Sequence, residues 1–577
     1  MATDELKILM QNLKLSVEKK DNEEASNEAL FAVVQSLTHE GADRRTLTEQ
    51  FVKNGITKHL ITYLQQDYVP KSVQCKVAEL VAELAKTDIA RKPCCDPTLV
   101  SLLVELLLNK DAEVALQACR ALGNICYEND QARMLVNEHR GTETLLQLLK
   151  NCLLDEFKGS EQLRVIATGF LLNLTNTYEI TQEKVLDAGV IDILCEYLER
   201  YWQDEDLCTH VLLTVNCIAD SELGRQKILA TNMCTALIRL LSKRINAEVI
   251  DTILELLSNL AESGTLATNA MKFQLASSNL CPTLIHLIAD RVGKTDEDSL
   301  SIIKTASELI NLLLTGDDSM VHLYNDGQGS LYKETISWLQ MSDEILQVAG
   351  ALAIGNFARR DEHCRQMVEQ GINDRLLTVL RKHNTADGDI RLQHAVLSAL
   401  RNLAIPIVNK GPMISCGIVD VVLPMTTIQT FPVVFKLLGT LRMLIQNAIA
   451  SRLGKDAKFL QRLIEWCNTD DHPGVKGATD LELVGVLGVT FYTTDSENDF
   501  QTAGIVDQAN ELLRGETNLP EVKANTLSLI CALTKSAKII DAIKNSNLPE
   551  IVKKLSSDSN SSVSDGANKV ITLIESG

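Results

Sequence analysis

The chain has 577 residues, more than the roughly 250–300 at which a single hydrophobic core stops growing, so it forms several domains or a repeat array. Apolar residues make up 45% and aromatic residues 4%, which excludes a disordered chain and favours helices packed on helices over a β-sandwich. The net charge of −20 excludes nucleic acid as an expected partner and favours basic proteins, although solubility alone also explains such a charge.

The N-terminal segment predicts a helical cap and no secretory leader. Residues 1–30 are polar with mixed charge, and Asp4 and Glu5 stand where a leader would be basic and then apolar. No apolar run approaches the roughly 20 residues that span a bilayer, so direct membrane insertion is not expected. The 15 cysteines lack metal-binding spacing and are interpreted as reduced, buried residues of a cytosolic protein, with the nucleus, the endoplasmic reticulum surface and mitochondria as further compartments.

A glycine recurs at the start of amphipathic segments along the chain. Gly371 precedes RLLTVL and lies 46 residues before Gly417, while other intervals of 86 and 87 residues are close to two periods of 43. We interpret each glycine as the turn that precedes a helix. These glycines are Gly55, Gly141, Gly189, Gly371, Gly417 and Gly504.

An asparagine recurs with the same period inside apolar helical runs such as ALGNICY and ALRNLAIP, 43 to 52 residues apart. This period is typical of HEAT and armadillo arrays. A glycine turn before one helix, then a longer run ending at asparagine, favours the three-helix armadillo unit. The predicted fold is an all-α, right-handed superhelical solenoid of about 11–13 armadillo repeats. The asparagines, called the Asn ladder below, are Asn124, Asn173, Asn216, Asn259, Asn311, Asn356 and Asn402.

Breaks in the repeat pattern divide the predicted solenoid into four parts. Residues 1–30 form the cap, residues 31–320 the N-terminal repeats, residues 321–465 the central repeats, and residues 466–577 divergent C-terminal repeats with a cap. A capped solenoid is expected to be a monomer, because its end repeats cover the apolar faces that would otherwise associate.

The Asn ladder has two interpretations. Asparagine inside a helix lowers helix propensity, so seven in register need a reason. On the last helix of each repeat they would line the concave groove, where their amides would hold an extended peptide or a partner surface. The structural alternative is a bond to the backbone of the neighbouring repeat. For any single asparagine the two weigh equally, and for the whole ladder partner binding is favoured.

Charged residues near the Asn ladder change sign along the chain. On a helix, positions i+3 and i+4 share a face with i. The groove is therefore predicted to be acidic through the first five or six repeats and basic in the next three, which would orient a ligand with a basic tail. Solvated helix ends are the alternative. The acidic residues are Glu128, Asp220, Glu262, Asp296, Glu297 and Asp298, and the predicted binding patch comprises Asn356, Arg359, Arg360, Arg401, Asn402 and Arg442.

The sequence carries no set of residues for covalent chemistry. Gly293-Lys294-Thr295 resembles the end of a phosphate-binding loop, but Ile288 stands where that loop needs its first glycine. The ten histidines have no metal-ligand spacing, and no serine lies in a G-x-S-x-G motif. No catalytic residue, metal or cofactor is therefore expected, and function is assigned to the groove.

Five stretches resemble the SmgGDS family of small-GTPase dissociation stimulators, and within it the invertebrate members. The resemblance covers most of the chain, and its last three stretches are more specific than general armadillo patterning. The stretches are Ala78–Cys94, Ala115–Tyr127, Leu346–Cys364 (LQVAGALAIGNFARRDEHC), Leu392–Lys410 (LQHAVLSALRNLAIPIVNK) and Phe435–Ile445 (FKLLGTLRMLI).

The resemblance implies a cytosolic armadillo protein that binds Rho- and Rap-type GTPases with polybasic, often prenylated, C-terminal tails. It also implies chaperoning of these GTPases and, for some Rho members, nucleotide exchange. The family's GTPase-binding patch falls on RNLAIP, hence on Asn402 with Arg401 beside it, and its electronegative patch matches Asp296-Glu297-Asp298. The chain departs from the family pattern after Trp466, so contacts beyond Arg442 are not carried over, and no prenyl pocket is assigned.

A non-covalent mechanism fits both the charges and the resemblance. The basic tail is attracted to the acidic half, the GTPase body docks on the surface from Asn356 to Arg442, and preference for the nucleotide-free state releases GDP. The alternative is an armadillo scaffold that binds extended peptides without altering a nucleotide. Importin-type arrays interleave tryptophans with their asparagines, whereas this chain has three tryptophans, none at one-turn spacing before the ladder.

Overall fold

The computed structural model describes residues 3–18, 23–39, 43–154, 161–262, 266–444, 504–515 and 519–576, together with the single residues 459, 462, 463, 466 and 486. Within these ranges every regular element is a helix. The chain forms two compact units, one of residues 1–287 with 295–312 and the other of residues 288–294 with 313–577. The prediction of an all-α fold is confirmed for the residues described.

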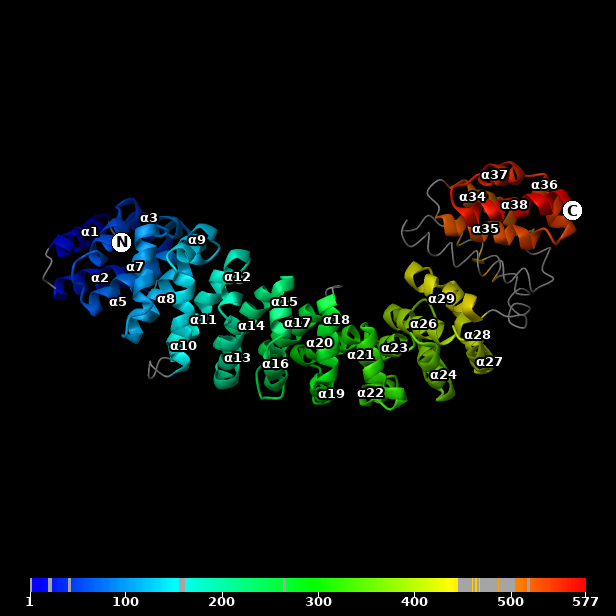
Figure 1. Ribbon diagram of the computed structural model, residues 1–577, viewed down its shortest axis with the longest axis horizontal. Helices are drawn as coiled ribbons and strands as arrows, with labels where there is room; N and C mark the ends of the chain where they lie inside the picture. The colour runs from blue at the N-terminus through cyan, green and yellow to red at the C-terminus, as the bar shows by residue number, and fades with distance from the viewer. Residues whose placement is uncertain are drawn as a thin grey trace. The chain divides into compact units, whose positions relative to one another are not determined.

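The first unit is built of helices joined by short turns (Figure 1). Its helices are α1 (Thr3–Glu18), α2 (Glu23–Thr38), α3 (Arg44–Lys53), α4 (Ile56–Leu64), α5 (Lys71–Ala85), α6 (Asp88–Cys94), α7 (Pro97–Leu106), α8 (Ala112–Cys126), α9 (Asp130–Glu138), α10 (Gly141–Leu153), α11 (Glu161–Thr175), α12 (Glu179–Asp187), α13 (Val190–Tyr201), α14 (Glu205–Ala219), α15 (Glu222–Leu229), α16 (Met233–Leu241), α17 (Ala247–Glu262), α18 (Leu266–Ser277), α19 (Leu280–Ala289) and most of α20 (Glu297–Leu314).

The second unit continues the same pattern of two shorter helices followed by a longer one. Its described elements are α21 (Asp317–Tyr324), η1 (Asn325–Gly327), α22 (Ser330–Trp338), α23 (Glu344–Phe357), α24 (Asp361–Glu369), α25 (Ile372–His383), α26 (Ile390–Leu403), α27 (Ile407–Ser415), α28 (Ile418–Val422), η2 (Leu423–Thr427), α29 (Phe431–Leu444), α34 (Ile505–Arg514), α35 (Pro520–Leu533), α36 (Ala537–Lys544), α37 (Leu548–Leu555) and α38 (Ser561–Ser576).

The third helix of each repeat packs against the third helix of the next. In the first unit α2, α5, α8, α11, α14 and α17 follow one another in this way, and in the second unit α23, α26 and α29 do the same. These helices bury mainly leucine, isoleucine, valine and alanine, and each also carries polar residues that remain partly exposed. These third helices, α2 to α17 in the first unit and α23 to α29 in the second, therefore form a row in each unit, which we call the inner row.

A left-handed residue precedes the second helix of most repeats, as the glycine signal predicted. Gly55, Gly189 and Gly371 have φ of 74°, 76° and 72°, a conformation that costs glycine little and other residues more. At one repeat the register differs by one position, because Arg140 holds the left-handed turn with φ of 59° and Gly141 is the first residue of α10. A Cβ on Gly141 would lie 2.6 Å from Cγ1 of Val136, so glycine is needed there for space.

Ten of the fourteen cysteines in the described ranges are buried, as the sequence predicts for most of them. Burial raises the pKa of the Cys94 thiol to about 12, so it stays protonated at neutral pH. Among the described residues no single helix is long and apolar enough to cross a membrane. The bent pair of α27 with the segment from Ile418 to Thr427, at 72°, meets the length and composition criteria only when the two are taken together.

Arginine side chains cap the carboxyl ends of inner-row helices. Arg225 donates from Nη1 to the carbonyls of Ala219 (2.7 Å) and Asp220 (3.1 Å) at the end of α14. Arg91 does the same for Ala85 and Lys86 at the end of α5. The last carbonyls of a helix lack partners within it, and a cation there also opposes the helix dipole. Part of the chain's positive charge is thus structural.

Candidate functional site

Six residues of the Asn ladder lie on the inner row and Asn311 lies on α20, and all seven are half-buried. Three of them donate across to the preceding inner-row helix. Asn124 Nδ2 lies 2.9 Å from the carbonyl of Ala82, Asn173 Nδ2 lies 3.1 Å from that of Gly123, and Asn402 Nδ2 lies 3.0 Å from that of Gly355. In these repeats the amide N–H forms the bond that the structural alternative describes.

The other ladder residues vary in their partners. Asn259 Nδ2 donates to Asn216 Oδ1 at 2.9 Å and to Asp220 Oδ1 at 3.3 Å, so three sequence-predicted residues meet here. Asn311 Nδ2 donates to the carbonyl of Ser307 within its own helix. The ladder is therefore a row of interrepeat bonds with local exceptions, and its role in partner binding stays a prediction.

Asn402→Ala is expected to destabilise the central repeats by about 1 kcal/mol, because it removes the bond to Gly355 and leaves a half-buried carbonyl without that donor. The measurement is the urea midpoint of the second unit. The matched control is Ser415→Ala in the same unit, since exposed Ser415 donates from Oγ to the carbonyl of Gly411 within α27 and its loss should change the stability by less than about 0.5 kcal/mol. Equal midpoints for Asn402→Ala and wild type would contradict this account.

Glu83 occupies a ladder position that the sequence pattern did not reveal. Asn173 and Asn402 each donate to the carbonyl of the residue that directly precedes the ladder asparagine of the previous repeat. Asn124 donates to the carbonyl of Ala82 in the same manner. The next residue, Glu83 on α5, therefore stands where asparagine would be expected. Its side chain is only 5% exposed, and a buried carboxylate requires charged partners.

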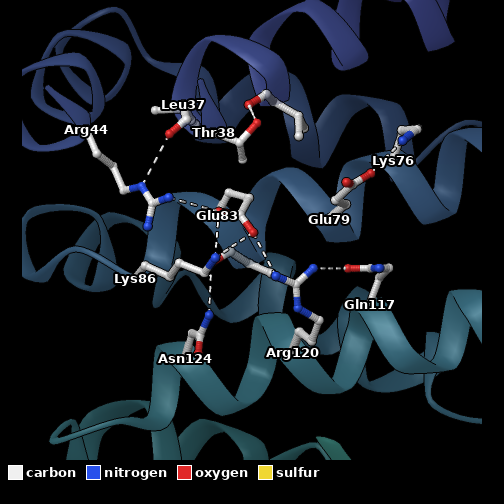
Figure 2. A network of polar contacts seen from close by, with 12 residues as sticks. Leu37, Thr38, Arg44, Lys76, Glu79, Glu83, Lys86, Gln117, Arg120 and Asn124 are labelled. Carbon is white, nitrogen blue, oxygen red and sulfur yellow. Dashed lines mark hydrogen bonds and ion pairs between the residues drawn. The ribbon is translucent and has the colours of Figure 1, made fainter. Parts of the chain in front are cut away.

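Three cations surround Glu83 (Figure 2). Lys86 Nζ lies 2.8 Å from both carboxylate oxygens, Arg120 Nη2 lies 2.7 Å from Oε1, and Arg44 Nη2 lies 3.8 Å from Oε2. Burial by itself raises the pKa of Glu83, but the hydrogen bonds from Lys86 and Arg120 outweigh it and lower the pKa below the usual value. We call Arg44, Lys86 and Arg120 the cation cluster. It lies within the repeats predicted to be acidic, so that prediction does not describe these first repeats.

An acidic pocket lies on α17 and the start of α20. Glu248 and Glu255 are exposed and share the uncovered face of α17 with Asn259, and Asp298 joins them from α20. Ser301 Oγ donates to Asp251 at 3.3 Å and ties the two helices together. The pocket is an open depression of about 550 Å³, lined by Asn246, Ala247, Glu248, Asp251, Thr252, Glu255 and Asp298.

Of the six acidic residues predicted from the sequence, Asp298 lines this pocket and the other five do not. Asp296 caps α20 by accepting the N–H of Ser299 at 2.9 Å, and Glu297 is exposed in the same turn. Glu262 is exposed at the end of α17, and Glu128 is exposed in a left-handed turn after α8 with φ of 50°. The sequence did not single out Glu248, Asp251 and Glu255, because they precede Asn259 on α17, whereas the predicted acidic residues follow a ladder asparagine or lie in the 296–298 loop.

Arg359 and Arg360 have different environments. The guanidinium of Arg359 donates to the carbonyls of Leu314 (2.7 Å) and Thr315 (2.9 Å) and lies 3.3 Å from Asp317. Arg359 is therefore another helix-capping arginine with a paired charge. Arg360 is exposed just before α24, and the part of either residue in binding stays a prediction.

Positive charge gathers on the uncovered faces of α26 and α29. A Cβ built on Gly439 would lie 2.8 Å from Nε of Arg401, so the guanidinium of Arg401 lies over this glycine. Burial and the charge of Arg401 lower the pKa of Lys436, and burial together with Lys436 lowers the pKa of His394. Half-buried Arg442 lies one helical turn beyond Gly439 on the same helix. These residues form a basic surface on the two helices.

Exposed apolar residues follow Asn402 at the junction of α26 and α27, where Ile405 lies in the turn and Ile407 and Val408 begin α27. The exposed fractions of Ile405, Ile407 and Val408 are 49%, 78% and 65%. Single exposed apolar residues are common on protein surfaces, but three within four positions form a patch that water solvates poorly and that a partner would cover. We call these three residues the apolar loop. The patch predicted on RNLAIP named Asn402 and Arg401 but no apolar residue, and the run IPIV at 405–408 is the signal that could have found these three.

Comparisons with known proteins identify the repeats and the relatives of this chain. Residues 95–127 match the model of the armadillo/beta-catenin-like repeat. The chain is 34% identical to Rap1 GTPase-GDP dissociation stimulator 1-B of Xenopus laevis, over 98% of each protein. It is 35% identical to GTPase-GDP dissociation stimulator vimar of Drosophila melanogaster, over 83% of the chain and 73% of the fly protein.

Among solved structures, a chain from a study of the phosphorylation switch in the interaction between cadherin and beta-catenin has a similar fold. It superposes with a TM-score of 0.55 at 15% identity and covers 89% of this chain and 100% of its own length. This likeness confirms the armadillo solenoid as the fold class.

Proposed function

Because the chain belongs to the SmgGDS family of GTPase-GDP dissociation stimulators, we propose that it binds small GTPases with polybasic C-terminal tails and accelerates the release of GDP. Rap-type GTPases are the first expected clients, since a relative is named for Rap1, and Rho-type GTPases the second. The observation that carries the proposal is the acidic pocket, with Glu248, Glu255 and Asp298 around a space of about 550 Å³.

The acidic pocket is proposed to hold the basic tail. The lysine and arginine side chains of such a tail are flexible. The pocket therefore needs closely spaced carboxylates rather than a shape that fits one conformation of the tail. Glu248 and Glu255 lie two turns apart on one face of α17, and Asp298 faces them from α20. Attraction of this kind raises the association rate and weakens with salt, because the charges are largely exposed.

The GTPase body is proposed to dock on α26, α29 and the apolar loop. Arg401, Lys436 and Arg442 provide positive charge on this surface, and Ile405 and Ile407 provide apolar area next to it. A patch with an apolar centre and charged surroundings is the usual composition of a protein interface. The acidic pocket belongs to the first unit and this surface to the second. Because the tail is flexible, the pocket can bind the tail and the surface can bind the GTPase body as two separate contacts.

Release of GDP needs no covalent step in this proposal. A ligand shifts an equilibrium by its difference in affinity for the two states. If the docking surface binds the nucleotide-free GTPase about a hundredfold more tightly than the GDP form, it lowers GDP affinity by the same factor. Chaperoning follows from the same binding. Burial of a prenyl chain of the partner would strengthen this binding by about 0.8 kcal/mol per buried CH₂ group. The cytosol is the proposed site of action.

Ile407→Asp is expected to weaken GTPase binding by at least about tenfold, because an apolar contact is replaced by a charge that must lose its water. Stability should change by less than about 0.5 kcal/mol, since Ile407 is 78% exposed and begins α27, where aspartate is favourable. Isothermal titration of full-length protein with a GDP-loaded Rap-type GTPase measures the effect. Tyr68→Asp, at a position 80% exposed outside the inner row, is the control; equal losses for both variants would contradict docking at the apolar loop.

The proposed function is tested by the release of fluorescent GDP from Rap-type and Rho-type GTPases, with substoichiometric amounts of the full chain. We expect faster release from at least one type, with turnover. Binding without acceleration would favour the alternative, an armadillo scaffold that holds extended peptides and leaves the nucleotide unchanged. Absence of both binding and release for both types would reject the proposal.

A further inference from the structure

The cation cluster around Glu83 holds more positive charge than its surroundings neutralise. Arg44, Lys86 and Arg120 carry three charges, and Glu83 is the carboxylate that they share. Of the other carboxylates close by along the chain, Glu79 pairs with Lys76 at 2.7 Å and Asp88 pairs with Arg45 at 3.3 Å, while Asp43 accepts the N–H and the hydroxyl of Thr46 at the start of α3.

Helix ends account for only part of this surplus. Arg44 Nε donates to the carbonyl of Leu37 at 3.3 Å, near the end of α2, and a helix end carries about half a negative charge. The end of α5 is capped separately by Arg91, through the carbonyls of Ala85 and Lys86. Between one and two positive charges therefore remain in the cation cluster.

The cluster is held in place yet open to a ligand. Arg120 is positioned by Gln117, whose Oε1 accepts from Nη1 at 2.7 Å (Figure 2). Gln117 in turn donates from Nε2 to Glu113 at 2.8 Å. The side chains of Arg44, Lys86 and Arg120 remain 39%, 37% and 22% exposed. Fixed guanidinium groups beside an ammonium group are the donors that bind oxyanions best.

We propose that the cation cluster binds the carboxylate side chains of an acidic segment in a protein partner. The site lies on the inner row, next to Asn124, where an extended chain would run from repeat to repeat. The net charge of −20 disfavours nucleic acid, whose backbone the whole protein repels, whereas a short acidic segment interacts mainly with the local charge. The site lies in different repeats from the acidic pocket and takes a ligand of opposite charge, so it is independent of the GTPase proposal.

The test is a titration of a fluorescein-labelled peptide of consecutive glutamates with the full-length protein, followed by fluorescence anisotropy at low ionic strength. Arg44→Gln with Lys86→Gln is expected to weaken binding about tenfold. The control, Arg45→Gln with Lys53→Gln, removes the same charge from cations of α3 that pair with Asp88 and Glu49, and it should change the affinity less than twofold. Equal losses in the two double variants would overturn the site.

A variant of opposite effect separates a change of charge from a loss of structure, because destabilisation does not raise an affinity. Glu83→Gln removes the shared carboxylate, so the cluster gains one net positive charge and should bind the glutamate peptide several-fold more tightly. Weaker or unchanged binding by folded Glu83→Gln protein would overturn the proposal. Inorganic phosphate is compared with chloride at equal ionic strength. Selective displacement of the peptide by phosphate would identify a site for small anions and overturn the assignment to an acidic segment.

Discussion

Reversal of two charges in the acidic pocket, by Glu248→Lys with Glu255→Lys, is expected to lower the affinity for a GTPase with a polybasic tail by about a hundredfold. Each reversal replaces an attraction by a repulsion of similar size, which weakens the binding free energy by about 1.4 kcal/mol, or tenfold in affinity. Two reversals therefore lower the affinity by about a hundredfold. Both side chains are exposed, so the folded structure should tolerate the change. Stopped-flow association across a salt series measures the affinity and its electrostatic part.

The matched control is Glu179→Lys with Glu183→Lys on α12, which changes the net charge equally on a helix outside the inner row. Its affinity should fall by less than about threefold, from the long-range field alone. A GTPase without its tail should bind wild type and both variants alike. An equal fall for the α12 variant, or a fall that persists without the tail, would remove the pocket from the account.

Glu83→Gln is expected to lower the stability of the first unit by about 2–3 kcal/mol. The glutamine keeps the shape of the side chain but gives up charged hydrogen bonds to Lys86 and Arg120, and it leaves three cations close together. Hydrogen exchange of the amides of α5 and α8 measures this effect locally, which suits a repeat array that does not unfold in one step.

The pH dependence of this effect distinguishes a charge effect from a packing effect. The pKa of Glu83 in the folded protein lies below the usual 4.5, so its stabilising contribution is fully present above about pH 4.5 and is lost as the pH falls through the folded pKa. The difference between wild type and Glu83→Gln should shrink in that range. Glu79→Gln, at the more exposed ion pair with Lys76 on the same helix, should cost less than about 1 kcal/mol. A difference independent of pH would contradict the charge account.

The fold could be predicted from sequence because the repeat signals follow directly from helix geometry. Gly371 and Gly417 are required by left-handed turns, and their spacing shows the length of one repeat. The exception, Arg140, shows the limit of that signal: the turn needs a left-handed residue but not always a glycine.

The site could be predicted only in part, because a sequence shows which face a residue shares but not what it bonds. Arg359 follows Asn356 by three residues and belongs to the predicted basic patch, yet it caps the end of a preceding helix. Glu83 interrupts the asparagine pattern, and its three cations come from α3, α5 and α8, so their meeting depends on tertiary packing. The acidic pocket likewise requires the approach of α20 to α17.

Hydrogen–deuterium exchange of the full chain, with and without a tail-bearing Rap-type GTPase, tests most directly whether the inner row is the binding surface. The account predicts slower exchange in residues 247–255 and 297–301 around the acidic pocket, and in residues 401–410 around the apolar loop. A GTPase without its tail should protect only residues 401–410. Protection confined to α3, α6, α9, α12 and α15, with the pocket and the loop unchanged in a saturated complex, would contradict the account.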